Sequence, residues 1–593
     1  MESISGLDAT FLYAETPTSP MHIGSVAIIE GSLDFKTFKE NLESKIHQIP
    51  KFRQRLVSIP FSIDYPYWVD DPNFNINLHL QRIALPKPYG WQELRTMASS
   101  IFSEHLDRSR PLWSMAFVEG IEGIDQVPKG STALISKVHH VAIDGMAGSS
   151  IMSVLFDMSD KPSPLKAPRP YKAKPLPNEI QMLRKSATTF AKKPLKFPKI
   201  IREAVSSTMK AGFITRSQLV DLPTAPFTAP KTSLNGIISA ERKWNTAIIS
   251  LERVKALKNI MGTTVNDVIL AICSGALRKY FLDKNKLPEK SLVAMVPIST
   301  RAAATDEKTS GNKVSMMLVQ LATEVKDSIE RLETIHSNTT KGKTYQGAIG
   351  AKALTSLAES VPFGVASQAA RVYSRFNLSN LHKPVFNVTI TNVPGPPIPL
   401  YCRGHKLHSI MGTAPIIDGM GMIITIYSYD GRITISPTSD AKSMPDLNTF
   451  TNYILDSANE LEAEILAKGK KLQAAKKKVT KAKSDKFFMA FRKYLKANPK
   501  FIKPKSGTFQ FKVTKPESAW SLNFNSPPGI VKKGTIAKPD VTVTIEDKNL
   551  VKITKGDLGF QLAFIQGRLK IDGDNKKAMR LAKILSLLPQ KLS

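Results

Sequence analysis

The stretch His139-His140-Val141-Ala142-Ile143-Asp144-Gly145 decides how the rest of this chain is interpreted. It follows an apolar run rich in β-branched residues, 133–138, which predicts a buried strand. Apolar residues then recur at helical spacing from Met146 to Met158, which predicts a helix. The two histidines are therefore expected where a strand ends, a position that can hold an imidazole rigidly beside a cleft.

Histidine suits proton transfer near neutral pH because its unperturbed pKa is about 6.5. We interpret His140 as a general base, with His139 as the second candidate. Asp144 could orient the imidazole from four residues on, or it could bind an arginine and fix the loop. Gly145 suits a tight backbone turn. Two other interpretations stay open at this stage: a histidine pair without a chemical role, and a metal site, although no Cys or Glu follows at a usual zinc-ligand spacing.

These residues also match a known motif. HHxxxDG at 139–145, preceded by Pro111-Leu112-Trp113, resembles the bacterial wax ester synthase/diacylglycerol acyltransferase family, which is related to the chloramphenicol acetyltransferase-like, CoA-dependent acyltransferases. Condensation domains of peptide synthetases carry HHxxxDG too, so other segments have to distinguish the families. The opening from Leu7 and the dipeptide Asn266-Asp267 are similar to further family motifs, and the resemblance extends over about 7–466 with a gap at 161–233.

The resemblance implies an α/β fold in which two chloramphenicol-acetyltransferase-like mixed α/β halves form a central tunnel. It implies that His140 accepts a proton from a hydroxyl as that hydroxyl attacks the thioester of a long-chain acyl-CoA. A fatty alcohol would give a wax ester, and diacylglycerol would give triacylglycerol, a storage lipid. By the same resemblance Asp144 is a structural anchor rather than a relay partner.

Two short segments are further site candidates. The resemblance places Asn266, Asp267 and the segment Pro111, Leu112, Trp113 in the substrate-binding region. Asn266 and Asp267 could also be ordinary polar residues of a first helical turn, where acids and amides are favoured. The segment 111–113 could simply be the proline-bounded start of a strand.

The chain of 593 residues is long enough for about three domain-sized units, and with 42% hydrophobic and 22% charged residues it is expected to be globular. We expect an N-terminal acyltransferase half at 1–160, a Pro/Lys-rich and basic amphipathic connector at 161–233, a C-terminal acyltransferase half at 234–467, a Lys-rich linker at 468–486, and a separate domain at 487–593.

Hydrophobic patterning predicts the elements of both halves. Strands are expected at 25–29, 74–80, 247–250, 292–297 and 385–391, and a hairpin is expected to turn at Asp430-Gly431. Helices are expected after Asp34, at 91–101 and after Thr264.

The last segment alternates apolar and polar residues at 509–513, 520–524 and 541–545, and it ends in 567–571 and an amphipathic helix through Met579 and Leu585. This order resembles a sterol-carrier-protein-like lipid-binding domain. The resemblance implies a small α+β domain with a lipid cavity.

The net charge of +33 implies an anionic partner: nucleic acid, an anionic membrane, or a polyphosphorylated ligand such as CoA. Nucleic acid ranks last, because the lysines concentrate in linkers and no nucleic-acid-binding motif accompanies them. The basic amphipathic segment 180–205 could lie in a membrane interface, or it could pack as a helix with a solvated basic face.

Cys273 and Cys402 cannot form a disulfide framework, and neither a signal peptide nor a membrane-spanning stretch is evident. We therefore expect a cytoplasmic protein that associates peripherally with the inner face of the membrane or with lipid inclusions. Acyl-CoA is expected as a co-substrate, with no further cofactor. The alternatives are a non-catalytic acyl-CoA or lipid carrier, and a condensation-type acyltransferase that uses carrier-protein thioesters.

Overall fold

The structure is a computed structural model, and it describes residues 2–59, 65–142, 147–162, 164–165, 167–176, 181–182, 224, 227–299, 314–348, 383–478 and 482–588. The chain divides into two compact units, Met1–Leu466 and Ala467–Ser593. Asp144 and Gly145 lie outside the described residues, as does most of the basic amphipathic segment 180–205.

The first sheet of the larger unit is mixed and has the strand order β13-β14-β2-β7-β6-β5, with β7 in its interior. Alternate residues of β7 face opposite layers of helices. Leu134 and Val138 pack in a core with α1, α2 and α4, whereas Ala133 and Ile135 pack in a second core with α3. The bounds are β2 His22–Ile29, β5 Leu80–Ala84, β6 Trp113–Ile121, β7 Ser131–His139, β13 Tyr401–Cys402, β14 His405–Thr413, α1 Gly6–Ala14, α2 Phe35–Lys45, α3 Trp91–Ser103 and α4 Ala147–Leu155.

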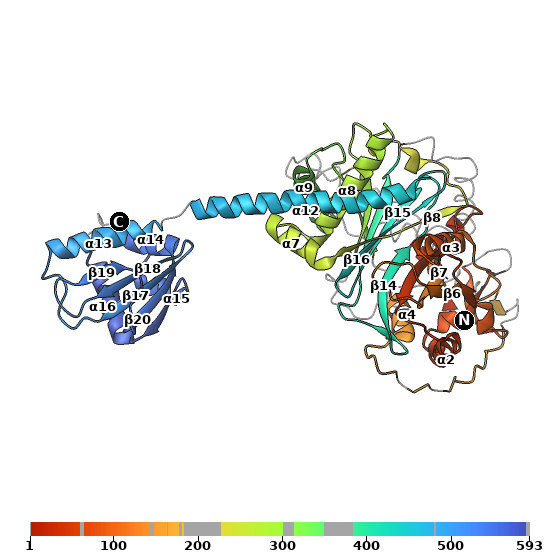
Figure 1. Ribbon diagram of the computed structural model, residues 1–593, viewed down its shortest axis with the longest axis horizontal. Coiled ribbons are helices and arrows are strands. Elements are labelled where there is room, and N and C mark those ends of the chain that lie inside the picture. Colours follow the sequence, from red (N-terminus) through yellow and green to blue (C-terminus); the bar gives the residue numbers. More distant parts are fainter. Residues whose placement is uncertain are drawn as a thin grey trace. The chain divides into compact units, whose positions relative to one another are not determined.

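The second sheet is also mixed, with the order β11-β10-β12-β15-β16-β8 and β9 paired to β16. Its apolar face packs under the helices α7, α8, α9 and α12, which gather on one side of the sheet in Figure 1. The bounds are β8 Arg242–Trp244, β9 Ala247–Ser250, β10 Val293–Ser299, β11 Val314–Gln320, β12 Val388–Pro394, β15 Met422–Tyr429, β16 Arg432–Asp440, α7 Leu251–Met261, α8 Val265–Asp283, α9 Ser328–Ala348 and α12 Leu447–Lys478. A small separate sheet has the order β1 Glu2–Ser3, β4 Tyr67–Asp70 and β3 Gln54–Val57.

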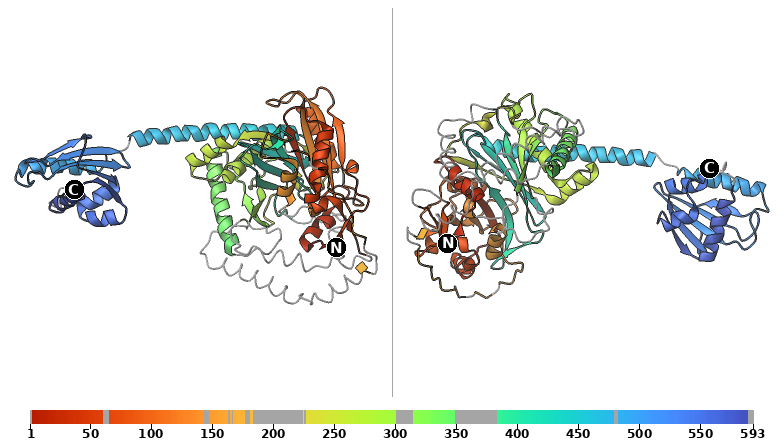
Figure 2. Two further views of the ribbon diagram at one scale, coloured as in Figure 1. Left: turned by 90° about the horizontal axis from the view of Figure 1, so that it is seen from below. Right: turned by 180° about the vertical axis from the view of Figure 1, so that it is seen from behind.

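Strand β14 joins the two halves. It comes late in the sequence, yet it pairs antiparallel with β2, and the teal β14 lies beside the red and orange strands in Figures 1 and 2. Hydroxyl groups of the second sheet bond to it: Thr434 Oγ1 donates to the Ile410 carbonyl at 2.8 Å, and Thr425 Oγ1 donates to the Gly412 carbonyl at 2.7 Å. A Cβ on Gly412 would lie 3.1 Å from Thr425 Oγ1, so glycine permits this close approach.

The smaller unit has a sheet of order β19-β18-β17-β20-β21 over an aromatic core, in which Phe488 stacks on Trp520 with ring centroids 5.0 Å apart. The bounds are β17 Thr508–Thr514, β18 Ser518–Asn523, β19 Ile530–Lys533, β20 Val541–Glu546, β21 Leu569–Gly573, α13 Ser484–Ala497, α14 Asp547–Lys555, α15 Phe560–Ile565 and α16 Asn575–Ser586. The alternating segments are thus strands of one α+β unit.

Most of the predicted elements are present, but the strand predicted at 74–80 is wrong. Residues Ile76–Leu78 form a 3₁₀ turn, and the strand begins only at Leu80. The Asn75 side chain accepts a hydrogen bond from the Asn77 N–H at 3.0 Å, and this local bond competes with extended pairing.

The lysine-rich stretch also contains more helix than a linker would. Helix α12 continues to Lys478, and α13 begins at Ser484, three residues before the expected start of the last domain. Lysine, alanine, glutamine and leucine are all good helix formers, so the sequence supports this continuation.

Candidate active site

The histidine pair lies at the end of β7. His139 is the last residue of the strand, and His140 begins a 3₁₀ turn, His140–Ala142. The His139 N–H donates to the Leu112 carbonyl at 2.9 Å, and the His140 N–H donates to the Met21 carbonyl at 2.8 Å. The backbone of the pair is therefore held on both sides, by the start of β6 and by the loop before β2.

The His140 ring is half-buried and stacks on Phe11 of α1, with centroids 3.7 Å apart and planes inclined by 10°. Burial lowers the pKa of His140 to about 4, an effect that its own backbone carbonyl opposes and that His139 reinforces. Its Nδ1 atom is buried and has no hydrogen-bond partner within the described part of the chain. At neutral pH the ring is uncharged, which is the form that a base requires.

His139 is almost fully buried and has a different environment. Its Nδ1 accepts a hydrogen bond from the Val141 N–H at 3.1 Å, so in the neutral ring the hydrogen is assigned to Nε2. Nε2 lies 3.6 Å from Oε1 of Glu15, which is an electrostatic contact too long for a hydrogen bond. Burial lowers the pKa of His139, and Glu15 partly opposes this shift.

Glu15 follows α1 directly, and its side chain is only 7% exposed. Its carboxylate accepts hydrogen bonds from Arg108 Nε at 2.7 Å and from the Met21 N–H at 3.2 Å. Burial alone would raise the pKa of this carboxyl, but His139 and Arg108 lower it to about 2. Sequence reasoning missed Glu15 and Arg108. The available signal was their position in the sequence: Glu15 lies shortly before Pro20-Met21, and Arg108 lies shortly before the segment 111–113.

The same face of the sheet carries two more buried basic side chains, those of His22 and Lys137. His22 is the cross-strand partner of His139, and burial followed by the charge of Lys137 lowers its pKa to about 3. Lys137 Nζ donates to the carbonyls of Ile101 and Glu104, so it satisfies the C-terminal end of α3. A polar layer thus continues from the histidine pair to α3.

The segment 111–113 supports β7 from the side. Leu112 is buried in the core, and the Trp113 indole N–H donates to the Phe52 carbonyl at 2.9 Å. The Trp113 ring stacks between Phe52 and His79, with centroid distances of 4.7 Å to each. Pro111 and Trp113 also line a small cavity of about 190 Å³ together with Lys137. These contacts explain the segment structurally, and its role in substrate binding stays a prediction.

Asn266 and Asp267 lie in the first turn of α8 but differ in their contacts. Asp267 is fully buried, and it accepts hydrogen bonds from the Thr264 N–H at 3.0 Å and from Thr339 Oγ1 at 2.7 Å, while His336 Nδ1 lies 2.7 Å away. Burial would raise the pKa of Asp267, but the hydrogen bonds from His336, Thr339 and Thr264 lower it. Asn266 is half-buried and makes no side-chain hydrogen bond to any residue that the structure describes.

Three successive parts of the chain match the models of known protein families. Residues 4–269 match the wax ester synthase/diacylglycerol acyltransferase catalytic domain, 310–462 match the C-terminal domain of that family, and 489–586 match the SCP-2 sterol transfer family. The chain is 33% identical over 470 residues to a Mycobacterium tuberculosis protein named putative diacylglycerol O-acyltransferase, and the match covers 78% of this chain and 90% of that protein. The chain belongs to the wax ester synthase/diacylglycerol acyltransferase family.

Further relatives agree with this family assignment. A second Mycobacterium tuberculosis protein of the same name is 31% identical over 458 residues, which cover 76% of this chain and 94% of that protein. The solved structure of the wax ester synthase/diacylglycerol acyltransferase from Marinobacter aquaeolei VT8 matches with a TM-score of 0.57 at 24% identity, over 78% of this chain and all of that one, and it shows the fold. The family makes this chain an acyl-CoA-dependent O-acyltransferase that forms wax esters or triacylglycerol, and not a non-catalytic carrier.

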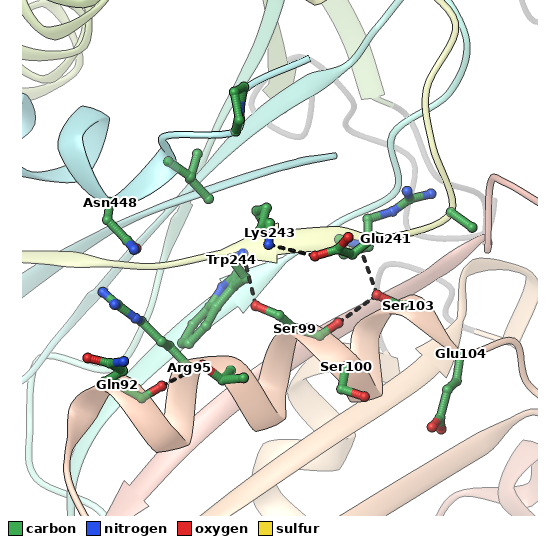
Figure 3. A pocket seen from close by; sticks show the side chains of 15 residues that line it. Gln92, Arg95, Ser99, Ser100, Ser103, Glu104, Glu241, Lys243, Trp244 and Asn448 are labelled. Atoms are coloured by element: carbon green, nitrogen blue, oxygen red, sulfur yellow. Dashed lines mark hydrogen bonds and ion pairs between the residues drawn. The ribbon is translucent and has the colours of Figure 1, made fainter. Parts of the chain in front are cut away.

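A larger cavity of this acyltransferase is lined by other residues than the described residues of the motif. It has a volume of about 700 Å³ and is lined by α3, β8 and the first turn of α12 (Figure 3). Ser99 and Ser103 of α3 accept hydrogen bonds from the backbone N–H groups of Trp244 and Arg242. Neither histidine of the pair lines this cavity.

Within the described ranges no single helix is both long enough and apolar enough to cross a membrane. Helices α7 and α8 together have that length and composition, but the chain bends sharply between them. No group of three or more His, Cys, Asp or Glu side chains suited to holding a metal ion occurs among the residues that the structure describes.

Proposed function

We propose that His140 is the general base with which this enzyme transfers a long-chain acyl group from acyl-CoA to a hydroxyl group, with acyl-CoA as co-substrate and no further cofactor. The observation that carries the proposal is the difference between the two histidines. His139 is fixed by Val141 and Glu15, whereas the His140 ring is held uncharged by burial and stacks on Phe11.

The chemistry follows from the neutral ring. We assign the ring hydrogen to Nδ1, the nitrogen nearer the backbone, which leaves the Nε2 lone pair free. Nε2 accepts the hydroxyl proton as the oxygen attacks the thioester carbonyl carbon. When the tetrahedral intermediate collapses, the CoA thiolate leaves and takes that proton from the imidazolium. General-base catalysis of this kind contributes a factor of about 10² to 10⁴.

The acceptor is a lipid alcohol, either diacylglycerol or a fatty alcohol. The relatives named as diacylglycerol O-acyltransferases favour diacylglycerol, and the family name includes both products. The SCP-2-like unit supports a lipid substrate in either case, and we assign it the task of delivering acceptor or removing product.

Attraction to an anionic surface would bring the enzyme to such acceptors. A net charge of +33 favours peripheral association of a cytoplasmic enzyme with the inner face of the membrane or with lipid inclusions. Sedimentation with anionic vesicles at 0.15 M and 1 M salt tests this. Release at high salt is expected because salt screens exposed charges, and binding that is insensitive to salt would contradict it.

The first experiment compares wild type with His140→Ala, each supplied with palmitoyl-CoA and either hexadecanol or a diacylglycerol. Release of free CoA and formation of the lipid product are both followed. Ester is expected from wild type only, and the ratio of wax to triacylglycerol names the main acceptor. His405→Ala is a matched control, because His405 lies on β14 and its ring contacts the Glu30 carbonyl. An active His140→Ala variant would overturn the assignment of the base.

A further inference from the structure

Glu15 lies where the segments that surround the histidine pair meet. One carboxylate oxygen accepts the Met21 N–H and faces His139 Nε2, and the other accepts hydrogen bonds from Arg108. The residue directly follows α1, the helix that carries Phe11. A single buried carboxylate therefore joins α1, the loop before β2, the end of β7 and the segment that leads into β6.

Three of the residues next to Glu15 also contact His140 or the residue after it. The Met21 carbonyl accepts the His140 N–H at 2.8 Å, so the Met21 peptide lies between Glu15 and the backbone of the base. His139 connects Glu15 to the Val141 N–H, which belongs to the residue after the base. Phe11 of α1, four residues before Glu15, stacks on the ring itself.

The charge on Glu15 determines how His139 can bond. An anionic oxygen at Nε2 favours a hydrogen on that nitrogen, because the carboxylate can only accept. The Nδ1 lone pair is then available to the Val141 N–H, and this bond fixes the turn 140–142. Arg108 holds the carboxylate in place and is itself about half exposed.

We propose that Glu15 is a positioning residue for the acyl transfer: through His139 and Met21 it fixes the turn that aims the His140 ring, and Arg108 holds the carboxylate for this purpose. The proposal rests on the proposed role of His140. Glu15 does not touch the reacting atoms in this assignment, so its loss misplaces the base without removing it.

The kinetic test uses Glu15→Gln, which keeps the size of the side chain and removes its charge. A base displaced by a fraction of an ångström slows the chemical step, so kcat is expected to fall about 10- to 100-fold. KM for palmitoyl-CoA is expected to stay within about 3-fold of wild type. Glu119→Gln is the matched control, because Glu119 pairs with the exposed Arg82 on the same half and should leave both constants unchanged.

A double variant separates positioning from folding. Glu15→Gln leaves the Arg108 charge without its partner, and a lower melting temperature is expected. Arg108→Gln added to Glu15→Gln removes both charges and is expected to recover most of the melting temperature while kcat stays low. Recovery of wild-type kcat in the double variant would overturn the proposal, because the charge at His139 would then be unnecessary.

Rescue through His139 gives a second readout. In His139→Asn the amide oxygen can occupy the place of Nδ1 and accept the Val141 N–H, whereas His139→Gln places its polar group near the position of Nε2. The Asn variant is expected to retain at least about 10-fold more kcat than the Gln variant. Equal kcat values would contradict the tautomer argument. If His140→Ala itself is active, the assignment of the base fails; if His140→Ala is inactive and Glu15→Gln is fully active, only the positioning role fails.

Discussion

Phe11 lies face to face with His140, with ring centroids 3.7 Å apart and planes inclined by only 10°. The two residues are far apart in the sequence, and α1 brings the phenyl ring onto the end of β7. The stack removes one face of the imidazole from water, and burial is the main cause of the low pKa of His140.

Replacing Phe11 with Ala is expected to raise the pKa of His140 from about 4 towards the ordinary value near 6.5, because water can then solvate the charged ring. A base must be uncharged to act, so activity is lost as the pH falls through this pKa. The acid limb of kcat/KM should therefore move to higher pH by about one to two units.

The measurement for Phe11→Ala is a pH–rate profile from about pH 3 to 8 with saturating acceptor, a range that includes the wild-type pKa. Phe35→Ala is the control, since Phe35 is also half-buried on a helix of the first half and packs against Phe117 and not against a histidine. An acid limb at the same pH in Phe11→Ala and wild type would show that the stack does not set the pKa.

Asn266 and Asp267 are expected to respond differently to substitution, although they are adjacent. Asp267→Ala leaves Thr264, Thr339 and the α9 histidine His336 without their buried partner, so a loss of about 1–3 kcal/mol in unfolding free energy is expected. Asn266→Ala breaks no bond to a described residue and should leave stability within about 0.5 kcal/mol.

Urea unfolding and steady-state kinetics on both variants check this difference. If the substrate-binding prediction for the dipeptide is right, Asn266→Ala raises KM or lowers kcat at normal stability. Normal kinetics and normal stability in Asn266→Ala would remove Asn266 from the site.

The sequence predicted local secondary structure better than the contacts between segments that are far apart in the chain. Strand β7, helix α4, the Asp34 cap, the start of a helix after Thr264 and the hairpin at Asp430-Gly431 all depend on local patterns, and local patterns were visible. Pairing of β14 with β2 joins residues about 380 apart, and no strand was predicted at 405–413, because His405, Lys406 and His408 interrupt the apolar pattern.

The same limit explains the residues that were missed around the histidine pair. Glu15 and Arg108 look like ordinary surface charges in the sequence, and only the fold places the carboxylate in a nearly buried position beside His139. Trp113 and Asp267 were predicted as substrate-binding residues from resemblance. Their hydrogen bonds are to the protein itself, which a motif cannot reveal.

Trp113→Phe tests whether the tryptophan serves mainly the packing behind β7. Phenylalanine keeps much of the stack with Phe52 and His79 but leaves the buried Phe52 carbonyl without the indole N–H. We expect a loss of about 1–3 kcal/mol in unfolding free energy and kcat within about 3-fold of wild type. A large loss of kcat at unchanged stability would instead support a direct contact between Trp113 and substrate.

Buried neutral histidines should make this protein sensitive to mild acid. The pKa values of His22 and His140 are lowered to about 3 and 4 by burial, whereas an unfolded chain has values near 6.5. Below pH 6.5 the unfolded state therefore binds more protons than the folded state, so stability that is present at pH 7 declines as the pH falls towards 4. Each of the two histidines should remove about 2 kcal/mol between pH 7 and pH 5.

Urea unfolding at pH 7, 6 and 5 measures this slope, and His22→Asn supplies the comparison. Asparagine does not titrate, so the variant should lose less stability between pH 7 and pH 5 than wild type does, by about 2 kcal/mol. His22 is the appropriate choice because it lies beside His139 on β2 without being the proposed base, so the proposed chemistry does not depend on its ring. Equal slopes in wild type and His22→Asn would mean that His22 is already solvated, or already charged, in the folded protein.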